Sequence, residues 1–259
     1  PRPPVSVLLI ADVHGAFDAL ADLADSGHDV IILGDLVNLI DYRSCEGIVP
    51  DVIGVTTIRE IVALRMAGRD AEARSRWREA TARLDIDVAS GVVAGMSHQY
   101  REMTVALRGL SGLVIHGNVD DPDMLRTHLP EGTEWADGAT RTIDGEVFGF
   151  VGGGVPRIGT PGEVDDETMR AKLSALGPVD VLCTHVPPAV PMLAEDTIGG
   201  RSKGSLPIRE YLEAFAPRRH YYGDVHQPRA TRMAFGSTLC VNVGYFRATH
   251  RGVVHTAHG

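Results

Sequence analysis

Short apolar runs alternate with polar breaks along the first part of the chain. Val5–Ile10 and Val30–Leu33 are such runs, and between them apolar side chains recur at helical spacing at Phe17, Leu20 and Leu23. Short apolar runs are typical of buried strands, whereas a three-to-four-residue spacing is typical of an amphipathic helix. The pattern therefore predicts a strand–helix–strand unit, which implies parallel strands and a right-handed crossover.

A long helical stretch separates the second strand from the third, which we place at Leu113–Ile115. The apolar stripe of Ile58, Ile61 and Leu64 predicts a helix that Gly68 interrupts. Two further helices are expected over about 70–84 and 96–110. We predict a single domain over 1–259 that contains a helical insertion over 52–110, which forms a lid or an oligomer surface.

The second half of the chain repeats the alternation of strands and helices, which makes the fold class α/β. We expect helices over about 165–176 and 206–215 and strands near 140–143, 147–151, 179–183, 220–222, 230–235 and 238–242.

Composition and charge narrow the class of protein. The 259 residues are 44% hydrophobic and 23% charged, as in ordinary globular proteins. The net charge of −9 disfavours general nucleic-acid binding, which needs a surplus of Lys and Arg. No apolar run of roughly 18 residues is present, so we expect no membrane span. Three scattered cysteines and an apolar run at 5–10 that is too short for a signal peptide favour a cytoplasmic location.

Polar residues cluster after five of the expected strands. The five segments are Asp12-Val13-His14-Gly15, Gly34-Asp35-Leu36-Val37-Asn38, Gly117-Asn118-Val119-Asp120, Thr184-His185-Val186-Pro187-Pro188 and Gly223-Asp224-Val225-His226. In open α/β sheets, ligands bind outside the carboxyl ends of the strands. Imidazole and carboxylate donors without thiolates suit Mn, Fe, Zn or Co. Seven donors exceed the needs of one tetrahedral ion, so we expect two ions of the kind that serve hydrolysis.

This ordered set of motifs resembles the calcineurin-like metallophosphoesterases. The resemblance extends from residue 12 to residue 228, and the Gly117–Asp120 segment together with Gly152–Gly154 is similar to the small prokaryotic phosphoesterase branch. It implies a four-layer α/β/β/α sandwich, two divalent ions and attack on phosphorus by a metal-bridging hydroxide. Mn²⁺ is the favoured ion, with Fe, Zn or Mg as alternatives.

The resemblance also implies roles for individual residues. Asp12, His14 and His226 would bind the first ion, and Asn118 and His185 the second. Asp35 would bridge the two ions.

Two positions depart from the family pattern. The family usually has a histidine, the expected proton donor to the leaving oxygen, where this chain has Val119. Asp120 either orients a water or a metal ligand in its place, or caps the following helix. The family also usually has a histidine at position 224, where we expect Asp224 to bind the second metal through oxygen and to favour harder ions.

Four further residues are candidates for substrate binding. Asn38 follows the second strand and either touches phosphate or forms a turn. Arg43, Arg157 and Arg201 are candidate phosphate ligands, and plain solvent exposure is the alternative for each.

We therefore predict a metal-dependent phosphoesterase in which Asp35, Asn118 and Asp120 carry the chemistry. Its partner is a small phosphorylated substrate, with a phosphodiester favoured. A cyclic-nucleotide phosphodiesterase or a phosphomonoesterase is the alternative within the enzymes, and a catalytically weakened binding scaffold is the alternative outside them. A nuclease is disfavoured by the acidic charge balance.

Overall fold

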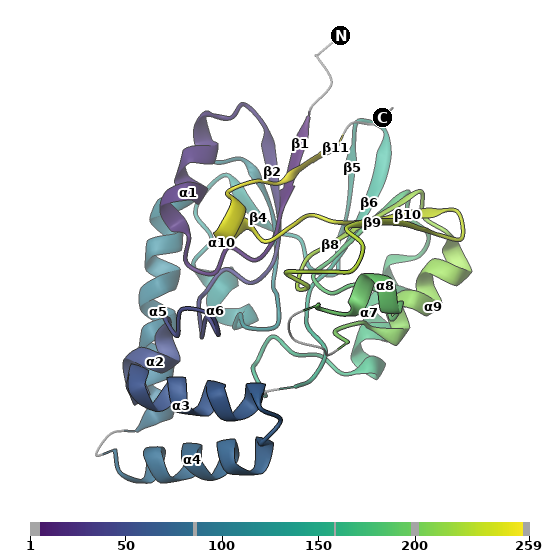
Figure 1. The fold of residues 1–259 in the computed structure, drawn as a ribbon. Coiled ribbons are helices and arrows are strands. Elements are labelled where there is room, and N and C mark those ends of the chain that lie inside the picture. The colour runs from purple at the N-terminus through teal and green to yellow at the C-terminus, as the bar shows by residue number, and fades with distance from the viewer. Residues whose placement is uncertain (1–5, 85–86, 158, 198–201, 256–259) are drawn as a thin grey trace. The chain divides into compact units, whose positions relative to one another are not determined.

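The computed structural model describes residues 6–84, 87–157, 159–197 and 202–255, and two β-sheets form its centre (Figure 1). The first sheet has the strand order β11-β1-β2-β3-β4. Its strands are β1 (Val7–Ile10), β2 (Asp29–Leu33), β3 (Gly112–Ile115), β4 (Thr133–Trp135) and β11 (Val253–His255). β1, β2, β3 and β4 are parallel, and β11 is antiparallel to β1. The predicted strand–helix–strand opening is confirmed.

The second sheet has the strand order β5-β6-β7-β8-β10-β9. Its strands are β5 (Thr140–Ile143), β6 (Glu146–Val151), β7 (Val181–Thr184), β8 (Arg219–Tyr222), β9 (Arg232–Phe235) and β10 (Thr238–Asn242). The four central strands are parallel, and the edge strands β5 and β9 are antiparallel to their neighbours.

Side chains from both sheets form one apolar core. Leu9, Ile31 and Ile115 of the first sheet lie in the same buried cluster as Phe150 and Val181 of the second. Because successive side chains of a strand point to opposite faces, each central strand contributes alternate residues to this core. The shared core thus holds the carboxyl ends of the strands of both sheets in fixed positions relative to one another.

Helices lie on both sides of the sheets, which makes the fold mixed α/β (Figure 1). Those outside the insertion are α1 (Phe17–Ala21), the 3₁₀ turn η1 (Asp22–Asp25), α6 (Pro122–Thr127), α7 (Asp166–Leu176), α8 (Pro191–Ala194), α9 (Leu206–Phe215) and α10 (Phe246–Thr249). Ser205 caps α9 by accepting the N–H of Ile208. Among the described residues, no helix has the length and apolar character needed to cross a membrane.

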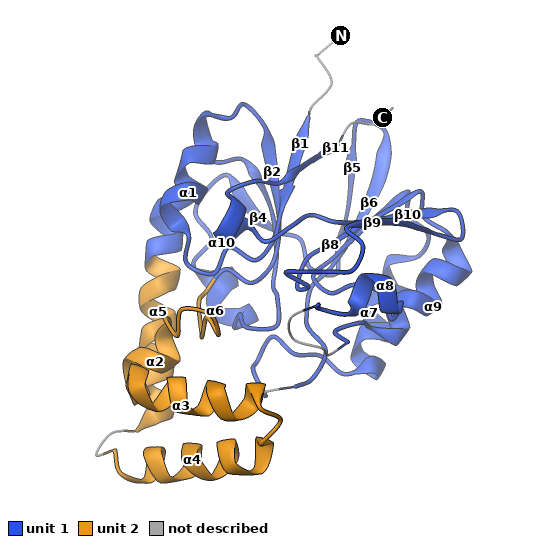
Figure 2. Ribbon diagram, viewed as in Figure 1, with its two compact units in different colours: residues 1–36, 102–259 blue, residues 37–101 orange. Residues whose placement is uncertain are grey.

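Residues 37–101 form a compact unit of their own (Figure 2). This unit holds α2 (Ile48–Ile53), α3 (Val55–Met66), α4 (Asp70–Ala82) and most of α5 (Val88–Ala106). Its own apolar cluster includes Ile53, Ile58 and Ile61. The unit overlaps the predicted insertion at 52–110, and the insertion's role as a lid or an oligomer surface stays a prediction.

The helix expected over 96–110 is wrong at both ends, because α5 covers Val88–Ala106. Gly91 and Gly95 lower the helical propensity of its first half, which hides the helix in the sequence. In the structure, a Cβ on Gly91 would lie 3.0 Å from the Val52 side chain, and a Cβ on Gly95 2.5 Å from that of Ile48. These glycines therefore let α2 approach α5 closely.

The sequence does not predict the short strands β4 and β11, which the structure adds to the first sheet.

Candidate metal centre

Four of the predicted metal ligands have left-handed backbone conformations. The φ angles are 59° at Asp12, 41° at His14, 55° at Asp35 and 60° at Asp224. Such conformations are uncommon outside glycine, although Asp and His adopt them more readily than most residues. Strain of this kind clusters at functional sites, where it aims a side chain at the expense of stability.

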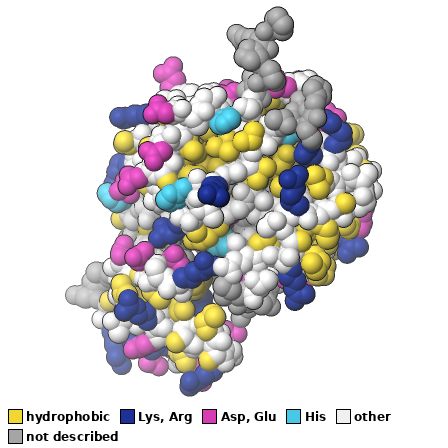
Figure 3. Space-filling view, turned by 45° about the horizontal axis from the view of Figure 1, so that its top comes forward, with side chains coloured by type: hydrophobic (Ala, Val, Ile, Leu, Met, Phe, Trp, Pro, Cys, Tyr) yellow, Lys and Arg dark blue, Asp and Glu magenta, His cyan; other side chains and the backbone are white. Residues whose placement is uncertain are grey.

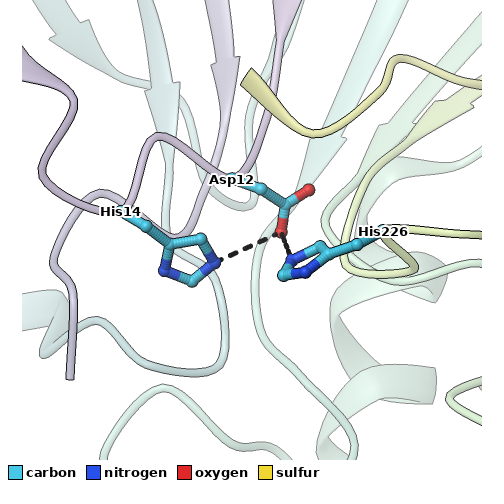
Figure 4. A group of neighbouring side chains, drawn as sticks. All are labelled: Asp12, His14 and His226. Carbon is cyan, nitrogen blue, oxygen red and sulfur yellow. Dashed lines mark hydrogen bonds and ion pairs between the residues drawn. The ribbon is translucent and has the colours of Figure 1, made fainter. Parts of the chain in front are cut away.

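The first candidate ligand group contains Asp12, His14 and His226, which converge in Figure 4. Asp12 Oδ1 lies 3.3 Å from His226 Nε2 and 3.8 Å from His14 Nε2. Asp12 and His14 follow β1, whereas His226 follows β8 of the other sheet. The group therefore joins the carboxyl ends of strands from both sheets.

The second candidate group contains Asp12, Asp35 and His185. The ligand atoms within each group all lie within 4.8 Å of one another. Asn118 adjoins the second group, because its Oδ1 lies 3.1 Å from His185 Nε2. The structure thus brings six of the seven predicted metal ligands together, with Asp12 common to both groups.

The Asp35 carboxylate lies between histidines of the two groups. Its Oδ2 is 3.5 Å from His14 Nε2, and its Oδ1 is 3.4 Å from His185 Nε2. The backbone N–H of Val119 also donates to Oδ1, at 3.0 Å. One carboxylate with an oxygen toward each group has the placement that a bridging ligand requires.

A backbone contact orients the imidazole of His185. Its Nδ1 lies 2.7 Å from the carbonyl oxygen of Leu33, in the neighbouring sheet. When Nδ1 carries the proton and donates to this oxygen, Nε2 faces Asn118 and Asp35. Histidines that bind metals usually donate their second ring N–H in this way, which fixes the ring and its tautomer.

Without a metal, the charged forms of Asp12, Asp35 and His185 stabilise one another. Burial lowers the pKa of His185, but the carboxylates of Asp35, Asp224 and Asp12 outweigh it and raise the pKa to about 10. Burial raises the pKa of Asp35, but His185 and His14 bring it well below its usual value. Burial likewise raises the pKa of Asp12, but the hydrogen bond to His226 and the charges of His226 and His185 together outweigh burial and lower it. Mixed imidazole and carboxylate donors of this kind fit divalent transition ions such as Mn²⁺.

Asp120 holds the backbone around Asp35. Its Oδ2 accepts the N–H groups of Asp35 and Gly117, each at 2.8 Å, and its Oδ1 accepts that of Leu36 at 3.0 Å. The alternative that Asp120 caps the next helix is wrong, because Asp121 caps α6 by accepting the N–H of Met124. Asp120 is fully buried and orients a candidate metal ligand, so its role is one of positioning.

Glycines allow the close approach of the loops that carry the ligands. A Cβ on Gly154 would clash with Asn118, and a Cβ on Gly117 would clash with the backbone N of Asp35. Gly154 thus places the Gly152–Gly154 segment against the loop that carries Asn118. Any side chain at Gly154 would displace Asn118 from His185.

Asp224 is placed differently from the other predicted ligands. Its Oδ1 accepts a hydrogen bond from Lys203 Nζ at 2.7 Å, and its carbonyl oxygen accepts another at 2.6 Å. Its own N–H donates to Asp12 Oδ2 at 3.0 Å. Asp224 therefore supports Asp12 from the backbone, while its carboxylate is paired with a lysine rather than grouped with the ligand atoms.

The predicted substrate-binding residues fall in different parts of the chain. Arg157 is exposed, and its guanidinium donates to the carbonyl oxygen of Ser202. Asn38 and Arg43 belong to the unit 37–101, where the N–H of Asn38 donates to Gln99 Oε1 at 2.7 Å. Arg201 lies outside the described residues. The substrate roles of these four residues stay predictions.

Sequence analysis missed Tyr245, whose ring packs against both histidines of the first group. It stacks on His226 with centroids 3.9 Å apart and planes 3° apart, and it meets His14 edge-on at 5.9 Å. The residue follows the end of β10, three positions after Asn242. Gly244 precedes Tyr245 just after the end of β10, and a glycine at a strand end is also present in the segments around Asp35, Asn118 and Asp224.

Removal of the Tyr245 ring is expected to weaken metal binding. Tyr245→Ala frees the His226 ring to rotate, and loss of such a supporting contact typically costs 10–100-fold in metal affinity. Tyr245→Phe keeps the stacking surface and is expected to stay within about threefold of the unmodified chain. Competition with a fluorescent chelator for Mn²⁺ measures both. Equal losses in the two variants would show that the hydroxyl, not the stacked ring, matters.

The comparisons with known proteins bear on the fold alone. No protein-family model and no curated protein matches the chain. One solved crystal structure aligns with a TM-score of 0.58 at 15% identity, over 98% of this chain and 99% of the other. The crystal structure of TT1561 of Thermus thermophilus aligns with a TM-score of 0.49 at 12% identity over the same shares. At these identities the first similarity supports a shared α/β architecture and says nothing of chemistry.

Proposed function

We propose that this chain is a metal-dependent phosphoesterase of the calcineurin-like type, with the four-layer sandwich of that family. The observation that carries the proposal is the position of Asp35, whose two carboxylate oxygens face one histidine of each candidate ligand group. Asp12 is a member of both ligand groups, so it is a second carboxylate that connects the two candidate metal sites. Two adjacent divalent metal ions catalyse the hydrolysis of phosphate esters in phosphatases and nucleases.

Each ligand has a defined part in this proposal. His14, His226 and Asp12 would hold one ion, His185 and Asn118 would hold the other, and Asp35 would bridge the two. When bound, such ions lower the pKa of water and stabilise the attacking and leaving oxygens of an in-line displacement. The chain itself keeps Asp35 ionised and its backbone fixed through Asp120.

Val119 limits the range of good substrates. Its side chain cannot donate a proton, and a positioned general acid typically contributes 10²–10⁴-fold. Its N–H, however, still orients Asp35. Esters whose leaving oxygen departs without protonation are therefore favoured, and a phosphodiester remains the preferred class over a monoester.

Charge and cysteine placement shape the remaining parts of the proposal. On the face drawn in Figure 3, Lys and Arg side chains are scattered among acidic and apolar ones. With a net charge of −9, this favours a small phosphorylated substrate over nucleic acid.

All three cysteines are free and buried, which is compatible with the reducing cytoplasm that we propose.

Metal-stripped protein refilled with Mn²⁺ is expected to hydrolyse bis-p-nitrophenyl phosphate faster than p-nitrophenyl phosphate. Refilling with Fe²⁺, Zn²⁺ or Mg²⁺ is expected to give slower turnover. The absorbance of released nitrophenolate measures the rates, and His226→Ala, which removes a ligand of the first group, is expected to be inactive. Folded protein without turnover in any of these metals would favour the binding scaffold.

A further inference from the structure

Lys203 holds a fixed position beside the candidate metal centre. It lies just before α9, and its ammonium donates to both the carboxylate and the main-chain carbonyl of Asp224. Its side chain is 25% exposed, whereas that of Asp224 is 7% exposed. The ammonium is therefore anchored on Asp224, and part of the Lys203 side chain is in contact with solvent.

The positive charge of Lys203 interacts with the carboxylates of the candidate metal centre. Besides Asp224, the carboxylates of Asp12 and Asp35 interact electrostatically with it. Asp224 and Lys203 together carry no net charge, as a neutral histidine at position 224 would. The pair thus cancels the extra negative charge that Asp224 alone would add.

The hydrogen-bonding capacity of the ammonium is only partly used. A lysine ammonium has three N–H donors. Within the described part of the chain, Asp224 accepts two of them. The third is available to an incoming anion. Because the two hydrogen bonds to Asp224 already restrict the rotamers of Lys203, binding an anion costs less side-chain entropy.

We propose that Lys203 binds a non-bridging oxygen of the substrate phosphate and that Asp224 is its anchor rather than a metal ligand. This inference rests on the proposed phosphoesterase function of the same site. It assigns to one lysine the part that we predicted for arginines from the sequence. It also implies that Asp12, Asp35 and the remaining ligands hold the metal ions without Asp224.

Phosphate binding and metal content, measured separately, test the proposal. In Mn²⁺-loaded protein, Lys203→Met is expected to weaken inorganic phosphate binding, followed by calorimetry, at least tenfold. The KM for bis-p-nitrophenyl phosphate is expected to rise by a similar factor, and the Mn²⁺ stoichiometry to stay unchanged. Lys203→Arg keeps the charge and is expected to retain most of the binding. Arg209→Met removes an exposed charge on α9 and is the matched control for long-range electrostatics.

A double variant guards against misfolding. Lys203→Met leaves the buried Asp224 carboxylate without its cation, which destabilises a protein. Lys203→Met combined with Asp224→Asn removes both charges, and we expect the same loss of phosphate affinity with full Mn²⁺ content. Unchanged phosphate affinity, or a change in bound Mn²⁺ in any of these variants, would overturn the proposal.

The two hypotheses fail in different ways. If the unmodified chain hydrolyses esters and Lys203→Met binds phosphate equally well, the assignment of Lys203 fails and the phosphoesterase stands. If the unmodified chain shows no turnover but binds phosphate through Lys203, the assignment stands and the proposed activity fails.

Discussion

Asp35→Asn is expected to lower turnover of bis-p-nitrophenyl phosphate by at least about 10³-fold and to remove one equivalent of Mn²⁺. The carboxylate is the only side chain in the site with one oxygen toward His14 and the other toward His185 among the described residues. An amide offers one oxygen and one NH₂ group, so it cannot serve both sides. Loss of a metal that clamps the attacking and leaving oxygens removes several kcal/mol of transition-state stabilisation, of the order needed for this effect.

The same substitution is expected to change how metal binding depends on pH. In the metal-free chain, the pKa of His185 is raised to about 10, so at neutral pH this histidine holds a proton that the metal must displace. Metal affinity therefore rises with pH through the neutral range, up to about pH 10. Asp35→Asn removes the largest of the charges that raise the pKa of His185, so fewer protons are released. Calorimetry in two buffers of different ionisation enthalpy counts these protons.

Asp25→Asn is the matched control, because it makes the same chemical change at an exposed position of η1. It is expected to leave turnover, metal content and proton release unchanged. Full Mn²⁺ content and turnover in Asp35→Asn would show that Asp12 alone links the two groups, and the bridging role of Asp35 would have to be abandoned.

The sequence predicts most of the sheet strands because burial selects their residues directly. Val30–Leu33 must be apolar on both faces, since one face meets the second sheet and the other is also buried, and this leaves an unbroken run. β11 leaves no such run: it is three residues long, and its His255 binds Glu146 and Tyr221 of the other sheet. A histidine that is buried through long-range hydrogen bonds has no local signature.

The candidate site was predictable to the extent that it follows strand ends. Asp12, Asp35 and His185 come directly after apolar strands, and parallel strands bring such residues to one edge. The pairing of Lys203 with Asp224 was not predictable, because it joins a loop and a strand end through tertiary structure alone. For the same reason, the sequence alone left open whether Asp120 caps a helix or holds a ligand.

Asp120→Ala is expected to lower the free energy of unfolding of the metal-free chain by about 3 kcal/mol at pH 8. Three backbone N–H groups, those of Asp35, Leu36 and Gly117, lose a buried acceptor. Each buried group left without a partner costs about 1–3 kcal/mol. Relief of the repulsion between the Asp120 and Asp35 carboxylates offsets part of this loss. Chemical denaturation followed by circular dichroism measures the difference.

The loss is expected to be larger at pH 5 than at pH 8. Burial and the neighbouring charge of Asp35 raise the pKa of Asp120 to about 6 in the folded chain. A carboxyl whose folded pKa is raised stabilises the fold when protonated, and this contribution fades as the pH rises through about 6. Relative to pH 8, the unmodified chain gains about 1.4 kcal/mol from Asp120 at pH 5, which the alanine variant cannot gain.

The Mn²⁺ affinity of the Asp120→Ala variant shows whether Asp120 positions Asp35 or only stabilises the fold. Without Asp120, the strained backbone of Asp35 loses two of its supports, and we expect Mn²⁺ to bind at least tenfold more weakly even where the variant is fully folded. Asp121→Asn is the matched control, because asparagine caps a helix as well as aspartate does. Normal Mn²⁺ affinity in a folded Asp120→Ala variant would mean that the left-handed turn at Asp35 holds its shape unaided. The strain at this strand end would then be supported by the flanking loops and not by a buried carboxylate.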